Sequence, residues 1–156
     1  MNWTIVAGFI AILGFCGWIY ARGKQKHDLT ATARTLGLQY TNQEFPNDIP
    51  LRRASFFAEN DRVEDLLQGV TQGFPVKAFT LVGFPGELAI EQAVVAIKTD
   101  ARVGEPTTLL RASELQVERV GDWLFFRRSQ RRLRASELKQ LISDCLSYLH
   151  AAEIAH

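Results

Sequence analysis

Acidic side chains that could do acid–base or metal chemistry gather in one polar segment. They are Glu59, Asp61, Glu64 and Asp65. Paired carboxylates of this kind can bind Mg²⁺ or share a proton. No glycine-rich phosphate loop and no second acid pair lies near them in the sequence, so we interpret the segment as a solvated charged turn.

The histidines and cysteines do not predict a catalytic or metal-binding set. His27 is followed by an aspartate in a charged segment, and His150 and His156 lie near the carboxyl end, where a general base seldom has a fixed position. Cys16 lies in a long apolar run and Cys145 lies on the apolar stripe of a predicted helix, so we expect neither a disulfide nor a zinc site. The sequence predicts no catalytic residue, cofactor or metal. An enzyme with an unrecognised carboxylate site stays an alternative.

The one concentrated charge feature is a basic segment near the carboxyl end. No acid interrupts residues 123–136, which carry a charge of +5. Anionic headgroups attract each nearby Lys or Arg by ~1 kcal/mol, so this segment would suit contact with a lipid surface. A protein partner, or a solvated loop balanced by acids folded beside it, would explain the same charges, and nucleic acid is not expected because no aromatic stacking platform accompanies them. The members of this arginine cluster are Arg127, Arg128, Arg131, Arg132 and Arg134.

These residues belong to a chain that begins with a long apolar stretch. Residues 3–21 contain no charge. As a helix rising about 1.5 Å per residue they would span roughly 28 Å, close to the ~30 Å hydrocarbon core of a bilayer. Trp3 at one end, and Trp18 with Tyr20 at the other, are spaced for the two headgroup layers. The sequence therefore predicts a transmembrane anchor over residues 1–21.

The flanking charges predict how this anchor is oriented. Arg22, Lys24 and Lys26 lie in a basic juxtamembrane collar, residues 22–27, and no charge precedes it. Lys and Arg near a membrane end stay on the cytoplasmic side. We expect a single-pass protein of the cytoplasmic (inner) membrane, with the N-terminus outside and residues 28–156 forming a cytoplasmic domain.

Two cleavable signals compete with the anchor interpretation. A secretory signal peptide carries its positive charges before a shorter apolar run, whereas here they follow it. A lipoprotein signal would need a small residue before Cys16, and Phe15 stands there. The anchor remains the prediction.

Within the anchor, small residues recur along one helical stripe. Ala7, Ala11 and Gly14 are its members outside the headgroup layer. Small residues let two helix backbones approach closely in lipid, so the stripe would suit docking to a membrane-protein partner or to a second copy of the chain. The alternative is that such residues are simply common in membrane helices.

The remainder of the chain predicts one α+β domain, an antiparallel sheet of about five strands packed by helices. Alternating apolar residues and turn signals indicate two hairpins, over 66–82 with its turn at Gln72-Gly73 and over 115–127 around Gly121-Asp122. A turn over 84–87 and a strand over 91–98 separate them.

Helices are predicted at both ends of this domain. A short helix over 28–36 would begin at Asp28 or Thr30 and end at Gly37. A long amphipathic helix over 135–152, with Ser136 as N-cap, closes the domain. Its apolar stripe is Leu138, Leu141, Ile142, Cys145, Leu146 and Leu149.

The order of these segments resembles a loose class of uncharacterised bacterial single-pass membrane-anchored proteins with a small cytoplasmic α+β domain. The resemblance rests on residues 73–79, on residues 117–125 and on the closing leucine helix. Residues 80–82 are Thr-Leu-Val, where these proteins often carry an aspartate and tyrosine pair. The resemblance implies a bacterial cytoplasmic domain and supplies no activity.

Taken together, the sequence favours a non-catalytic membrane-anchored interaction or accessory domain, part of a membrane-associated complex. Contact with anionic lipid through the arginine cluster is the first alternative, and an enzyme is the second. The expected partners are the bilayer and a membrane protein or a second copy of the chain.

Overall fold

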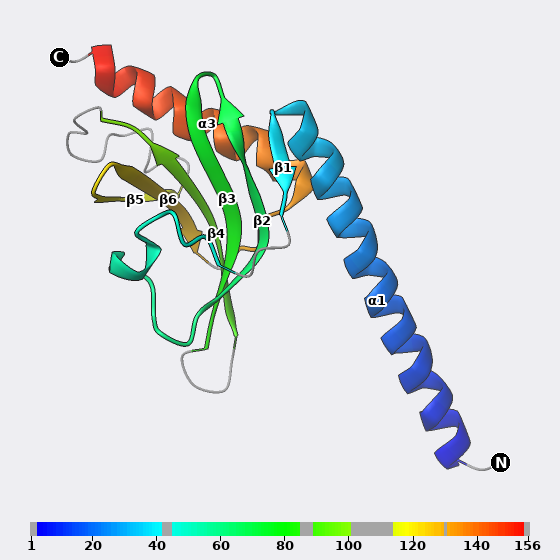
Figure 1. Cartoon of the computed structure of the whole chain (residues 1–156). Helices are drawn as coiled ribbons and strands as arrows, with labels where there is room; N and C mark the ends of the chain where they lie inside the picture. The colour runs from blue at the N-terminus through cyan, green and yellow to red at the C-terminus, as the bar shows by residue number, and fades with distance from the viewer. Residues whose placement is uncertain (1–2, 42–44, 85–88, 101–113, 130, 155–156) are drawn as a thin grey trace.

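The computed structural model describes residues 3–41, 45–84, 89–100, 114–129 and 131–154, and these residues form two α-helices and a six-stranded sheet. Helix α1 (Trp3–Thr35) projects far beyond the sheet, and helix α3 (Ala135–Ile154) closes the domain (Figure 1). The predicted turn over 84–87 lies outside the described residues after Phe84. The predicted α+β class is confirmed.

The sheet is antiparallel throughout, in the order β1-β2-β3-β4-β6-β5. Both predicted hairpins are confirmed. Gln72 and Gly73 have φ angles of 52° and 86°, the left-handed pair that a tight two-residue hairpin turn requires, and Gly121 has a φ of 65° in the second turn. The strands are β1 (Leu38–Tyr40), β2 (Arg62–Thr71), β3 (Phe74–Gly83), β4 (Ile90–Lys98), β5 (Gln116–Val120) and β6 (Trp123–Ser129).

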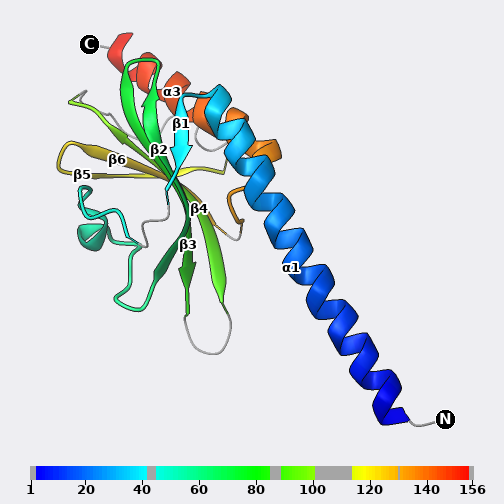
Figure 2. The ribbon, with the colours of Figure 1, turned by 45° about the vertical axis from the view of Figure 1, so that its right-hand side comes forward.

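Both faces of the sheet are covered by other parts of the chain. On one face Val76 and Ala78 of β3 pack with α3 and with the end of α1. On the other, Phe79 and Leu81 pack under residues 45–58, which include the short 3₁₀ helix η1 (Leu51–Arg53). Figure 2 shows the helices on one side of the sheet and this segment on the other. The alternation along β3 follows the two-residue period of a strand.

The predicted apolar stripe of α3 is confirmed. Its six members are all buried in the core beneath the helix. The predicted N-cap is wrong, because α3 begins at Ala135 and Ser136 lies inside its first turn. The amides of Glu137 and Leu138 donate to the carbonyl oxygen of Arg134, at 3.1 Å and 2.9 Å.

Helix α1 differs from the expectation of two separate helices. It runs without a break from the apolar stretch through the collar to Thr35, so the predicted start at Asp28 or Thr30 is wrong. The Thr30 hydroxyl donates to the carbonyl oxygen of Lys26 at 2.8 Å, one turn back within the same helix, instead of capping a new one. The predicted end is confirmed, because Gly37 has a φ of 75°.

The amino-terminal part of α1 is long and apolar enough to cross a membrane. Several of its large apolar side chains are exposed, among them Leu13 at 65%, Trp18 at 55% and Ile19 at 52%. A run of exposed apolar side chains along one helix is typical of a surface that contacts lipid or another protein. The carboxyl-terminal part is different, since Leu29 and Ala33 are fully buried in the domain core.

Candidate functional site

Arg132 occupies the centre of a charged network at the edge of the domain. Its side chain is 18% exposed and lies in the connection between β6 and α3. The guanidinium donates to Glu64 at 2.7 Å, to Asp65 at 2.9 Å and to Glu91 at 2.9 Å. We call these four residues the Arg132 network. It joins β2, β4 and the connection between β6 and α3.

A bulge in β2 makes this network possible. Consecutive side chains of a regular strand point to opposite faces, so Glu64 and Asp65 could not both reach one guanidinium. The register with β3 shifts between Glu64 and Leu67, and Asp65 has a φ of 56° in the left-handed region. A bulge of this kind redirects one side chain, here Asp65, toward Arg132.

Thr80 of β3 supports the bulge from inside the sheet. Its side chain is fully buried and its hydroxyl donates to Asp65 at 3.4 Å. The same oxygen accepts a hydrogen bond from the amide of Leu133 at 3.1 Å. The hydroxyl therefore connects the bulged strand with the segment that carries Arg132.

The protonation of Arg132 follows from these neighbours. Burial alone would lower its pKa, but the charges of Asp65 and Glu64 and their hydrogen bonds raise it above the usual value. The guanidinium therefore stays charged and neutralises carboxylates that would otherwise be partly buried without a partner.

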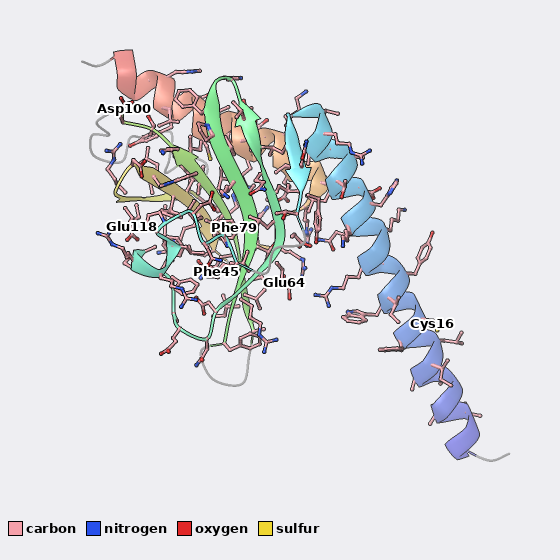
Figure 3. All side chains as sticks on the ribbon, viewed as in Figure 1. Cys16, Phe45, Glu64, Phe79, Asp100 and Glu118 are labelled. Carbon is pink, nitrogen blue, oxygen red and sulfur yellow. The ribbon has the colours of Figure 1, made fainter. Side chains whose placement is uncertain are left out.

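Helix α1 joins the same network through Arg22. Arg22 Nη2 lies 2.9 Å from Glu64 Oε2, and its guanidinium lies over the ring of Trp18, 5.1 Å from the centroid. One turn further, the ammonium of Lys26 lies 4.5 Å from the centroid of the Tyr40 ring. In Figure 3, Glu64 lies at the side of the sheet that faces α1. The network thus ties the end of the apolar stretch to the domain.

A cleft of about 480 Å³ separates α1 from the sheet edge at this point. We call it the α1 cleft. One wall is α1, and the other is formed by β1, β2 and the side chain of Arg132. Its walls include Trp18, Ile19, Arg22, Gly23, Lys26, Tyr40, Glu64, Asp65 and Arg132.

The structure does not bring the arginine cluster together on one surface. Arg127 and Arg128 alternate along β6, so that Arg127 lies 5.1 Å from the Phe56 ring centroid on one face and Arg128 lies 3.9 Å from Glu137 of α3 on the other. Arg131 also approaches Glu137, at 3.3 Å, and Arg134 is exposed. Arg132 belongs to the network described above.

The first two members of the acidic segment, Asp61 and Glu59, lie apart from the Arg132 network. Asp61 accepts a hydrogen bond from the amide of Ala58 at 2.9 Å, which closes a local turn, and Glu59 is exposed. Among the described residues, no group of three or more His, Cys, Asp or Glu side chains is placed to hold a metal ion.

The predicted small-residue stripe is open along α1, where Ala7, Ala11 and Gly14 are all exposed. The aromatic residues of the predicted headgroup layer, Trp18 and Tyr20, are exposed too. Trp3 is the first residue of the helix.

Lys24 of the collar and the described histidines do not line the α1 cleft. Lys24 is exposed and does not line the cleft, and His27 is exposed. The ring of His150 lies near that of Phe74, with 6.1 Å between centroids, and His156 lies outside the described residues. Cys145 is fully buried, and this burial raises the pKa of its thiol, as expected for an unreactive core cysteine.

A buried lysine on the face of the sheet opposite the helices escaped the sequence analysis. The side chain of Lys77 is 8% exposed, and its ammonium lies 2.7 Å from Asp48 and 2.9 Å from Gln68. Gln39, Gln68 and Lys77 stand opposite one another on neighbouring strands. The ion pair fastens the 45–50 segment to the sheet, and the charge in an otherwise apolar alternation was the signal that could have found it.

The chain matches no protein-family model, no curated protein and no solved structure. The resemblance to membrane-anchored bacterial proteins therefore stays a prediction. The features of the chain that bear on its function are α1, the Arg132 network and the α1 cleft.

Proposed function

We propose that the chain is a single-pass membrane protein whose sheet domain lies in the cytoplasm and serves as a non-catalytic interaction or accessory subunit of a membrane complex. The observation that carries this proposal is the continuity of α1. One helix passes from an exposed apolar stretch to Leu29 and Ala33, which are fully buried in the domain core. A domain joined in this way has a fixed distance from the bilayer and a restricted orientation, which suits presentation of a surface to a neighbouring membrane protein.

The proposed orientation rests on the charges at the end of the apolar stretch. Arg22, Lys24 and Lys26 follow it directly, and residues before Arg22 carry no charged side chain. Moving such a basic group across the membrane is disfavoured, so the domain side is cytoplasmic.

The proposed partner meets the stripe formed by Ala7, Ala11 and Gly14. All three are exposed, and a Cβ added at Gly14 would have no heavy atom within 4 Å among the described residues. A second helix could therefore approach the α1 backbone closely there. The partner is a membrane-protein helix or a second copy of α1.

Cross-linking of the full-length protein in native membranes, followed by purification in mild detergent, tests this function. Gly14→Leu should remove the cross-linked companion or dimer, because the larger side chain keeps the helices apart. Cys16→Leu, on the opposite side of α1, is the matched control and should retain it. Docking through the stripe would be refuted if the wild type gave no cross-linked product. It would also be refuted if both variants retained the product equally.

Lipid contact through the arginine cluster, the alternative function, is supported by fewer arginines than the sequence suggested. Arg131 and Arg134 are exposed, whereas Arg127 and Arg128 are half-buried at different faces and Arg132 is bound by carboxylates. Anionic vesicles would then bind through two arginines instead of five, with a correspondingly weaker dependence on salt.

A further inference from the structure

The α1 cleft lies at the level where the proposed anchor leaves the bilayer. Trp18 and Ile19 form its wall at the apolar end and are exposed at 55% and 52%. Arg22 and Lys26 follow on the same side of the helix. From Trp18 to Lys26 the helix rises about 12 Å, so the cleft extends from the edge of the hydrocarbon into the headgroup layer.

The cations of the cleft differ in how they are paired. Three cations, Arg22, Lys26 and Arg132, and two carboxylates, Glu64 and Asp65, line the cleft, and Glu91 binds Arg132 as a third carboxylate from outside that lining. Both carboxylates bind Arg132, and Glu64 binds Arg22 as well. Lys26 packs on the Tyr40 ring, and no carboxylate of the described residues lies within 4.0 Å of its ammonium. Lys26 is therefore the cation of the cleft that pairs with no carboxylate of the described residues.

Between the two basic residues, Gly23 leaves room beside the helix. A Cβ built at Gly23 meets no heavy atom within 4 Å in the described part of the chain. The cleft thus combines an apolar mouth, an unneutralised ammonium, a neighbouring guanidinium and open space between them.

We infer that the α1 cleft binds one phospholipid of the surrounding bilayer. The phosphodiester is held between the ammonium of Lys26 and the guanidinium of Arg22, and the acyl chains pass along Trp18 and Ile19. Charge-assisted hydrogen bonds from Lys and Arg to phosphate oxygens are strong, and here the apolar and charged ends of the cleft match the two ends of the ligand. This inference rests on the proposed function, because it requires α1 to span the membrane.

Native mass spectrometry of the full-length protein in mild detergent tests the site. The wild type should retain one phospholipid. After removal of lipid it should rebind phosphatidylglycerol but not diacylglycerol, which has the same chains without the phosphate. Lys26→Gln should reduce retention about fivefold, the factor that corresponds to ~1 kcal/mol for one basic side chain near a headgroup.

Two further variants make the result specific. Gly23→Leu fills the cleft without changing its charge and should also reduce retention, while its helix content should match or exceed that of the wild type because leucine favours helix over glycine. Lys24→Gln removes the same charge as Lys26→Gln from a residue that does not line the cleft, and should leave retention unchanged.

Equal retention by wild type, Lys26→Gln and Lys24→Gln would overturn the inference, as would equal binding of diacylglycerol. If the inference is overturned in either way but the protein stays in the membrane fraction, the proposed function is unaffected. If the wild type is found in the soluble fraction, the proposed function and this inference both fail.

Discussion

At Arg132, three segments far apart in the sequence meet through charge. The acidic residues Glu64 and Asp65 and the arginine cluster are separate features of the sequence, and in the structure Arg132 of that cluster binds both acids. Acids folded beside Arg132 balance its charge, as one of the sequence hypotheses expected, but its side chain is 18% exposed and is not part of a solvated loop. The pairing could not be predicted because Asp65 faces Arg132 only by virtue of the bulge in β2.

Replacement of Arg132 tests whether this network stabilises the domain. Arg132→Gln should lower the free energy of unfolding by roughly 3 kcal/mol, because it leaves partly buried carboxylates without their cation. Arg134→Gln, an exposed neighbour in the same cluster, should change it by less than about 0.5 kcal/mol. Denaturant unfolding of the full-length protein in mild detergent measures both, and equal effects would contradict a structural role for the network.

Among the elements, those with a local repeating pattern could be predicted from the sequence. The two hairpins follow from alternating apolar residues around glycine turns, and α3 follows from one uninterrupted leucine stripe. The continuity of α1 could not be predicted from its caps, because Asp28 and Thr30 look like a helix start but lie inside a helix that already exists. Lys77 and the bulge at Asp65 depend on partners brought together only by the fold.

Substitution of Leu141 measures how strongly α3 is bound to the sheet. Leu141 is 2% exposed, so Leu141→Ala should lower the free energy of unfolding by about 2–5 kcal/mol through lost burial and the resulting cavity. Lys139→Ala changes an exposed residue of the same helix and should have little effect. Unfolding curves in which the two variants coincide would show that α3 does not pack on this core.

Gly69 tests the close approach of β1 and β2, which connects α1 to the sheet. A Cβ at Gly69 would lie 2.2 Å from the carbonyl oxygen of Gly37, a backbone atom that cannot move alone. Gly69→Ala should therefore separate β1 from β2 and cost about 1–3 kcal/mol of stability. Gly23→Ala meets no such obstacle and should be neutral or stabilising by up to about 1 kcal/mol. Thermal melts that rank the two variants the other way would contradict this account of the β1–β2 contact.

For the whole molecule, α1 is both the proposed anchor and part of the domain core. Its apolar half is exposed, and its last turns bury Leu29 and Ala33 beneath the sheet. The Arg22–Glu64 ion pair lies where these two halves meet. If α1 spans the bilayer as proposed, one unbroken helix connects the anchor to the domain, since α1 runs from Trp3 to Thr35.

The orientation of α1 in the membrane can be measured with one pair of fusions. In a bacterial host, a fluorescent protein that matures only in the cytoplasm, fused after His156, should be bright in the membrane fraction, and alkaline phosphatase fused at the same position should be inactive. Both results follow if Arg22, Lys24 and Lys26 hold the domain side of α1 in the cytoplasm. An active phosphatase together with a dark fluorescent fusion would place the domain outside and contradict the proposed orientation.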